Sequence, residues 1–106
     1  MSAWNANGLT VRTVTTTGDT VLYTDDVILY TNTAAKAAAI QGAANAANQQ
    51  GKVYHFSNGA TGTLTITPAS GTIDGAATKV IAAGTAAAPV CASIVATPTG
   101  WVTFSN

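Results

Sequence analysis

The side chains that could carry out acid–base or nucleophilic chemistry are few and scattered in this sequence. His55 is the only histidine, so the chain has no multi-histidine metal site. A Ser-His-Asp set could be assembled from Ser57 or Ser93 with His55 and Asp74, but no nucleophile elbow accompanies it. We therefore expect a structural role for His55, with a pH-sensitive interface contact as the alternative, and no enzymatic activity.

The carboxylates are four aspartates, with no glutamate. Asp25 and Asp26 are adjacent, and aspartate commonly bonds to the backbone that follows it in a turn. A calcium site made by this pair with Asp19 or Asn32 is the alternative. We favour the turn, and we predict neither a metal ion nor a cofactor.

Three further motifs have simple structural interpretations. Cys91 lies in an apolar run, which favours a buried small side chain over a reactive thiol. The glycine-rich stretch 59–63 lacks the Gly-Lys-Ser/Thr pattern of a phosphate-binding loop. Thr63, Thr65 and Thr67 alternate as on an ice-binding surface, but the pattern occurs cleanly only once.

The aromatic residues allow two interpretations. Tyr23, Tyr30 and Trp101 are candidates for contact with a glycan, because their rings could stack on a sugar. In the alternative interpretation, Trp101 anchors the core and Trp4 packs at a subunit contact.

Charge is scarce throughout the chain. Only eight of 106 side chains are charged, four of each sign, whereas an ordinary domain of this size has roughly 26. A neutral surface loses its water at little cost, so we infer that much of this surface is buried against other copies or a larger assembly. The zero net charge argues against nucleic-acid binding. No apolar run reaches the 18 or so residues of a membrane span, so we expect no membrane insertion.

The elements that must position these residues are short strands separated by turn-forming residues, at a spacing typical of all-β domains. The expected strands are 21–23, 27–30, 53–56, 63–67, 72–75, 78–81, 90–97 and 101–105. We expect 53–56 to pair with 63–67 as a hairpin, and 90–97 to pair with 101–105 across Pro98-Thr99-Gly100. Residues 82–88 are expected to form a loop. Leu64 and Ile66 share one strand face, so an aspartate at either position should prevent folding.

Two segments depart from this pattern. Residues 33–50 are rich in alanine, which predicts a short helix that begins at Asn32 or Thr33 and ends at Gly51. We expect replacement of Lys36 in this segment by alanine to change little. Residues 1–18 are irregular and predict either an edge strand or an arm that finds its partner on another chain.

From residue 20 onward, the order of elements resembles the small β-rich knob domains of tailed-phage virion proteins. The segments that carry the resemblance are the paired strands and turn of 20–32, the Gly-Lys-Val-Tyr-His-Phe strand of 51–56, the Leu-Thr-Ile-Thr-Pro and Thr-Ile-Asp-Gly-Ala segments of 64–76, and the closing pair of 92–104. The resemblance implies a homotrimer of antiparallel β-domains on a virion. The family has a further strand where this chain has its alanine-rich segment, and residues 1–18 match nothing in the family.

Together these observations predict an all-β fold: an antiparallel β-sandwich or prism-like domain with one short alanine-rich helix, homotrimeric. Residues 1–18 would be the arm or edge strand, and 19–106 a single β-domain. The N-terminus lacks a signal peptide, so we expect synthesis in the host cytoplasm and assembly there into a virion.

The expected function is that of a phage capsid-decoration or head-fibre protein that binds the major capsid protein or another virion protein. Attachment is expected through Trp4, Leu9, Val11 and Arg12. A decoration role is preferred to a fibre tip because the chain starts at its own Met and has no shaft repeat. The first alternative is the tip domain of a tail fibre, which would bind a receptor or glycan on the host surface. A free-standing carbohydrate-binding module is the second alternative.

Overall fold

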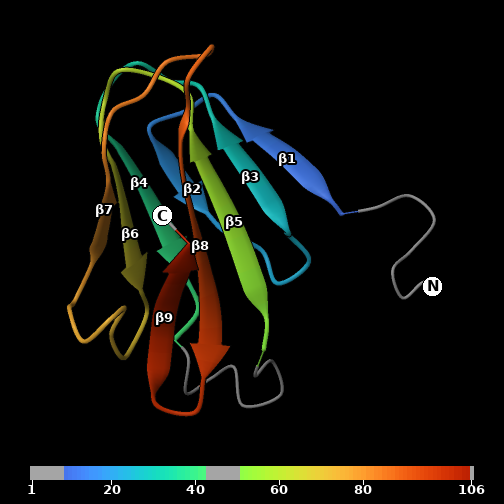
Figure 1. Ribbon diagram of the computed structural model, residues 1–106, viewed down its shortest axis with the longest axis vertical. Helices are drawn as coiled ribbons and strands as arrows, with labels where there is room; N and C mark the ends of the chain where they lie inside the picture. Colours follow the sequence, from blue (N-terminus) through green and yellow to red (C-terminus); the bar gives the residue numbers. More distant parts are fainter. Residues whose placement is uncertain (1–8, 43–50, 106) are drawn as a thin grey trace.

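The chain folds into two stacked β-sheets (Figure 1). The computed structural model describes residues 9–42 and 51–105. Sheet A has the strand order β1 (Val11–Val14), β3 (Val27–Tyr30), β5 (Val53–Asn58), β8 (Val90–Thr97) and β9 (Gly100–Ser105). Sheet B has the order β2 (Gly18–Thr20), β4 (Lys36–Ile40), β6 (Leu64–Pro68) and β7 (Lys79–Ile81). The prediction of an all-β fold is confirmed.

The first six strands alternate between the two sheets. As a result β1, β3 and β5 lie parallel in sheet A, and β2, β4 and β6 lie parallel in sheet B. The last three strands join antiparallel, β7 to β6, β8 to β5 and β9 to β8. Both sheets are therefore mixed, and the prediction of an antiparallel domain is wrong for the first six strands.

One predicted hairpin is wrong and the other is confirmed. The predicted partners 53–56 and 63–67 lie in different sheets, because the segment between them crosses from sheet A to sheet B. Their apolar side chains, such as Phe56 and Leu64, then meet in the core between the sheets. The hairpin of β8 and β9 is present as expected, and the Thr97 hydroxyl accepts a hydrogen bond from the Gly100 amide at 3.2 Å.

The predicted helix over 33–50 is also wrong where the structure describes it. Residues 36–40 form β4, between β2 and β6, and residues 43–50 lie outside the described part of the chain. The strand buries Ala38 and Ile40 on its inner face and gains hydrogen bonds on both edges, which outweighs the modest helix propensity of alanine. The described residues contain no helix, and hence none long and apolar enough to cross a membrane.

The core fills the space between the sheets. Its buried residues are Val14, Val21, Ile28, Tyr30, Ala38, Ile40, Tyr54, Phe56, Leu64, Ile66, Ile73, Ile81, Ala92, Ile94, Ala96 and Trp101. Trp101 donates from Nε1 to the Gln41 carbonyl at 2.9 Å, and its ring centroid lies 5.6 Å from that of Tyr54. The interpretation of Trp101 as a core anchor is confirmed.

The Asp74-Gly75 turn has the backbone expected of this dipeptide. Both residues have positive φ, 54° for Asp74 and 82° for Gly75. Ile73 and Ala76 exchange two backbone hydrogen bonds across them. Such a turn favours glycine and aspartate because its left-handed backbone strains most other residues.

The N-terminal stretch supplies the first strand of each sheet. Within residues 1–18, Val11–Val14 form β1 at the edge of sheet A, and β2 at the edge of sheet B begins at Gly18. Residues 1–8 lie outside the described part of the chain.

Candidate interaction surface

All eight charged side chains lie away from the outer faces of the two sheets. They are Arg12, Asp19, Asp25, Asp26, Lys36, Lys52, Asp74 and Lys79. The four in strands pair in register with core residues, Arg12 with Ile28, Asp19 with Ala38, Lys36 with Leu64 and Lys79 with Ile66. Residues paired in register lie on the same side of a sheet, so these four occupy inner positions. The other four lie in turns and loops.

The first strands hold a charged cluster between the sheets. Arg12 donates from Nη1 and Nη2 to Asp19 at 2.8 and 3.0 Å, and from Nε and Nη2 to Asp25 at 3.0 and 2.8 Å. The Tyr30 hydroxyl donates to Asp19 at 2.8 Å, and the Leu22 amide donates to Asp25 at 2.8 Å. The cluster is satisfied internally and mostly hidden from solvent.

This environment shifts the pKa values of the cluster. The hydrogen bonds from Arg12 to Asp19 and Asp25 raise the pKa of the guanidinium. Burial acts to raise the pKa of Asp25, but the bonds from Arg12 and the Leu22 amide outweigh it, so this pKa is lowered. Burial, followed by the bond to Asp19, raises the pKa of Tyr30. Arg12 and Asp25 are therefore charged at neutral pH, and the Tyr30 hydroxyl keeps its proton.

Lys36 is buried and ties two loops together. Its Nζ donates to three backbone carbonyls, those of Asn32 at 2.6 Å, Ala34 at 3.1 Å and Gly62 at 2.9 Å. Burial lowers the pKa of this ammonium group. The expectation that Lys36→Ala changes little is thus inconsistent with the structure, since the substitution would remove three hydrogen bonds of a buried side chain, although the Gly62 carbonyl would keep its bond from Asn58.

The remaining ion pair lies at the start of β5. Lys52 Nζ donates to Asp26 at 3.2 Å and lies 5.7 Å from the centre of the Tyr23 ring. The hydrogen bond from the Thr10 amide, followed by that from Lys52, lowers the pKa of Asp26. Asp25 and Asp26 thus belong to a turn, as predicted, and both also bind cations of the protein itself.

The outer face of sheet A carries no Asp, Lys or Arg, and presents six aliphatic side chains among serine, threonine, histidine and cysteine. Its side chains form three rows across the strands, according to the pairing register. The rows are Val53, Val95 and Val102; Val11, Val27, His55 and Ser93; and Thr13, Leu29, Ser57 and Cys91. Val11 is 57% exposed and Val102 is 42% exposed.

The outer face of sheet B is uncharged too, but its side chains are small. It presents Gly18, Thr20, Ala37, Ala39, Thr65, Thr67 and Val80. Val80 is its only large aliphatic side chain. Thr65 and Thr67 lie opposite alanines in the neighbouring strand, so the threonine row of β6 is not repeated on β4.

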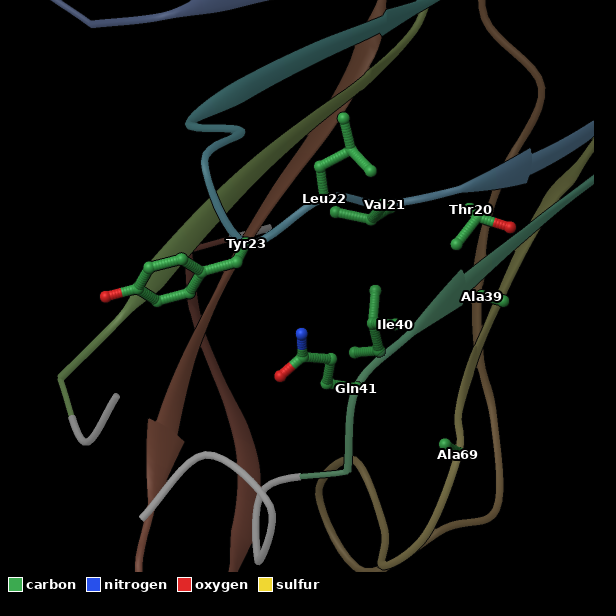
Figure 2. A pocket seen from close by; sticks show the side chains of 8 residues that line it. All are labelled: Thr20, Val21, Leu22, Tyr23, Ala39, Ile40, Gln41 and Ala69. Atoms are coloured by element: carbon green, nitrogen blue, oxygen red, sulfur yellow. The ribbon is translucent and has the colours of Figure 1, made fainter. Parts of the chain in front are cut away.

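A shallow cavity of about 360 Å³ lies beside the loop after β2. Figure 2 shows Leu22 and Tyr23 on one side of it, and Ala39 and Ala69 on the other. The lining is mostly aliphatic. Leu22 and Tyr23 are each 52% exposed, so this is a second place where apolar side chains face solvent.

The three residues predicted to bind a glycan differ in their exposure to solvent. Tyr30 and Trp101 are each only 1% exposed, so neither ring offers a face to a sugar in this fold. Burying these large rings in the core stabilises the fold more than leaving them at the surface would. Tyr23 alone of the three remains accessible.

The predicted attachment residues also separate. Leu9 and Val11 are both 57% exposed, at and just before β1. The guanidinium of Arg12 is instead engaged by Asp19 and Asp25, so it is not available to a partner. Trp4 lies outside the described residues.

The side chains proposed for a Ser-His-Asp set do not come together as one. His55 Nδ1 lies 2.7 Å from the Ser93 hydroxyl, across β5 and β8. Asp74 accepts a hydrogen bond from the Thr103 amide at 2.7 Å, so it does not orient the imidazole. The hydrogen bond to Thr103 lowers the pKa of Asp74.

Two other expectations concern ligand chemistry. Cys91 is exposed, which corrects the prediction of a buried thiol; it occupies an outward position of β8, next in register to Ser57. Asp19 and Asp25, two of the proposed calcium ligands, both face Arg12. In residues 9–42 and 51–105 no three His, Cys or Asp side chains are grouped as a metal site would need.

Sequence reasoning missed Lys36 and the distribution of charge over the two faces. Lys36 stands two and four residues before Ala38 and Ile40, and so on the same face of a strand as these buried residues. This spacing was the available signal for an inward Lys36, but the alanine content of the segment obscured it. The neutral faces could be found only once the strand pairing was known.

Comparisons with family models, with curated proteins and with solved structures found no match to this chain.

Proposed function

We propose that this chain is a structural protein of a tailed-phage virion, a capsid-decoration or head-fibre protein that binds the virion surface as a homo-oligomer. The resemblance of residues 20–105 to virion knob domains supports the virion setting, and it implies a trimer. The role is one of binding rather than catalysis, with assembly in the host cytoplasm.

One observation supports the proposal of a homo-oligomer. Neither sheet presents a charged side chain on its outer face, although all eight charged residues are described. Soluble monomers usually carry charges on such faces, which keep them apart. Burying a neutral face costs no ion desolvation, so these faces suit contact with another protein.

The attachment to the particle is assigned to the N-terminal side of β1. Leu9 and Val11 are exposed aliphatic side chains on an edge strand. Arg12 has an internal structural role, so it is no longer among the residues proposed to attach the protein to the particle. The major capsid protein, or another protein of the particle, is the proposed partner.

The first experiment measures the mass of the protein in solution by light scattering at micromolar concentration. The proposal requires a mass of about three times the 10.5 kDa of the chain. The second experiment tests cosedimentation with phage capsids that lack this protein. A Leu9→Asp variant, outside the strands of either sheet, should remain an oligomer but lose cosedimentation. A monomeric wild-type protein that does not bind capsids would refute the proposal.

A receptor-binding or glycan-binding tip is the second candidate, and Tyr23 is the observation that favours it. This ring is 52% exposed beside the cavity of Figure 2. A glycan array would test this function, with Tyr23→Ala as the variant that should lose any signal. Binding that survives in Tyr23→Ala would exclude this site.

A further inference from the structure

We propose that Lys36 and Asn58 form an amide bond between their side chains, which joins sheet B to sheet A covalently. Lys36 begins β4 in sheet B, and Asn58 ends β5 in sheet A. The bond would connect Nζ of the lysine to Cγ of the asparagine and release ammonia. This inference concerns a covalent modification within one chain and goes beyond the proposed function.

The two side chains meet at one backbone carbonyl. Lys36 Nζ donates a hydrogen bond to the Gly62 carbonyl at 2.9 Å, and Asn58 Nδ2 donates to the same oxygen at 2.8 Å. The nitrogen that would attack and the nitrogen that would leave are therefore no more than two hydrogen bonds apart. Holding two reacting groups side by side in this way raises their effective concentration by orders of magnitude.

Both groups are also buried. Lys36 is 3% exposed and Asn58 is 0% exposed, so solvent water has little access to the asparagine amide and does not compete with the lysine for it. Burial lowers the pKa of the Lys36 ammonium group. It thereby favours the neutral amine, which is the form of lysine that has a lone pair and can attack a carbonyl carbon.

The amide of Asn58 is only partly satisfied by the fold. Its Nδ2 donates to the carbonyls of Gly62 and Ala82, but its buried Oδ1 has no hydrogen-bond partner. A buried polar atom without a partner is rare in native proteins and often belongs to a strained or reactive group. The amide that lies beside the buried lysine is thus also one whose oxygen the fold leaves unpaired.

The usual competing reaction of this asparagine is disfavoured. An asparagine that precedes a glycine can cyclise when the glycine nitrogen attacks its side chain, and Asn58 precedes Gly59. The Gly59 amide donates to the Tyr30 carbonyl at 2.9 Å, which directs this nitrogen towards β3. Lys36 is therefore the better placed of the two nucleophiles.

The reaction balances without an oxidant, a reductant or a further reactant. The ammonium group of Lys36 first loses a proton to solvent, and the lone pair of Nζ then attacks Cγ of Asn58. A proton passes from Nζ to Nδ2 in the tetrahedral intermediate, the bond between Cγ and Nδ2 breaks, and ammonia leaves. One primary amide and one amine become one secondary amide and one ammonia.

No carboxylate of the chain is placed to act as the base. All four aspartates are engaged by other groups, namely Arg12 for Asp19 and Asp25, Lys52 for Asp26, and the Thr103 amide for Asp74. The rate should therefore follow the fraction of Lys36 that is neutral. This fraction rises about tenfold per pH unit as long as most of the lysine is charged.

The test is the intact mass of the purified wild-type protein after incubation at about pH 7, 8 and 9. We expect a species one ammonia lighter than the unmodified chain, which forms about tenfold faster for each pH unit. Trypsin should then fail to cleave after Lys36, so that the fragment 13–52 is recovered linked to the fragment 53–79. The linked fragments decide the matter, because cyclisation at Asn58 also releases ammonia but links no peptides.

Two variants serve as controls. Lys36→Arg keeps the charge and the hydrogen-bond donors but removes the nucleophilic amine, and Asn58→Ser removes the amide. Neither variant should yield linked fragments. Wild-type protein whose two fragments remain separate after incubation at about pH 9 would overturn the inference. Ammonia loss that maps to Asn58 and Gly59 alone would overturn it too, and both readouts use the wild type, so they hold even if a variant fails to fold.

Discussion

Arg12 donates two parallel hydrogen bonds to the carboxylate of Asp19, at 2.8 and 3.0 Å, and so joins β1 of sheet A to β2 of sheet B. The Asp19 side chain is only 7% exposed. Both strands are edge strands, so the pair covers the core at the end where both sheets begin. A charged pair that satisfies itself can close this end, whereas a single unpaired charge there would destabilise it.

Removing Arg12 should therefore destabilise the fold. Arg12→Ala leaves Asp19 and Asp25 without their cation, at an expected cost of about 2 to 4 kcal/mol in the free energy of unfolding. Arg12→Lys keeps the charge but loses the fork that binds both carboxylates, so it should cost less than Arg12→Ala and more than zero. Urea denaturation measures both. Equal stability of Arg12→Ala and wild type would contradict the role assigned to the pair.

Stability should fall in acid. The pKa values of Asp25, Asp26 and Asp74 are lowered in the folded protein, so the unfolded chain binds protons at a higher pH than the folded chain does. The stabilisation is present in full above the ordinary aspartate pKa of about 3.9 and is lost as the pH falls through and below it. The urea midpoint should stay level between pH 7 and 5 and then drop.

Asp74→Asn provides the control for this dependence. It removes one of the three carboxylates at an exposed turn, where asparagine tolerates the positive φ. Its acid-induced loss of stability should be smaller than that of wild type. A midpoint that does not change down to pH 2.5 in wild type would show that these carboxylates do not stabilise the fold.

Lys36→Ala should be among the more damaging single substitutions. It removes a donor from the carbonyls of Asn32, Ala34 and Gly62, of which Gly62 keeps its hydrogen bond from Asn58, and it empties the buried space that the lysine side chain fills. We expect a loss of about 2 to 4 kcal/mol in urea denaturation. Lys79→Ala, at a half-buried edge position, should change stability by no more than about 0.5 kcal/mol. Similar values for the two variants would rule out the proposed tie between the loops.

Ile66→Asp should prevent folding. Its side chain is fully buried at the centre of sheet B, and a carboxylate there would have no partner. Thr67→Asp, one position along the same strand, places the carboxylate on the outer face and should fold. Circular dichroism distinguishes the two. A folded Ile66→Asp would mean that the register of β6 is wrong.

The closing hairpin and the Asp74-Gly75 turn were predictable because their signals are local. Trp101 follows the Pro98-Thr99-Gly100 turn and precedes the exposed Val102 in a short strand, so its place in the core could be expected. Only the character of the candidate surface was predictable. The scarcity of charged residues indicated a neutral surface, but it did not indicate which strands form that surface. Cys91 was misplaced because a run of small apolar residues does not reveal which alternate positions face inward.

Composition and alternation determined by themselves that this chain forms β-strands, that Leu64 and Ile66 face a core, and that its surface carries little charge. Tertiary structure alone decided that β5 pairs with β3 and β8 rather than with β6, that the alanine-rich residues 36–40 form a strand, and that Lys36 lies inside. The physical reason is that side-chain alternation depends on neighbours in sequence, whereas strand partners and buried hydrogen bonds depend on segments distant in the chain. A preference of about 1 kcal/mol or less per residue for helix is outweighed when two neighbouring strands supply hydrogen bonds and a core to bury against.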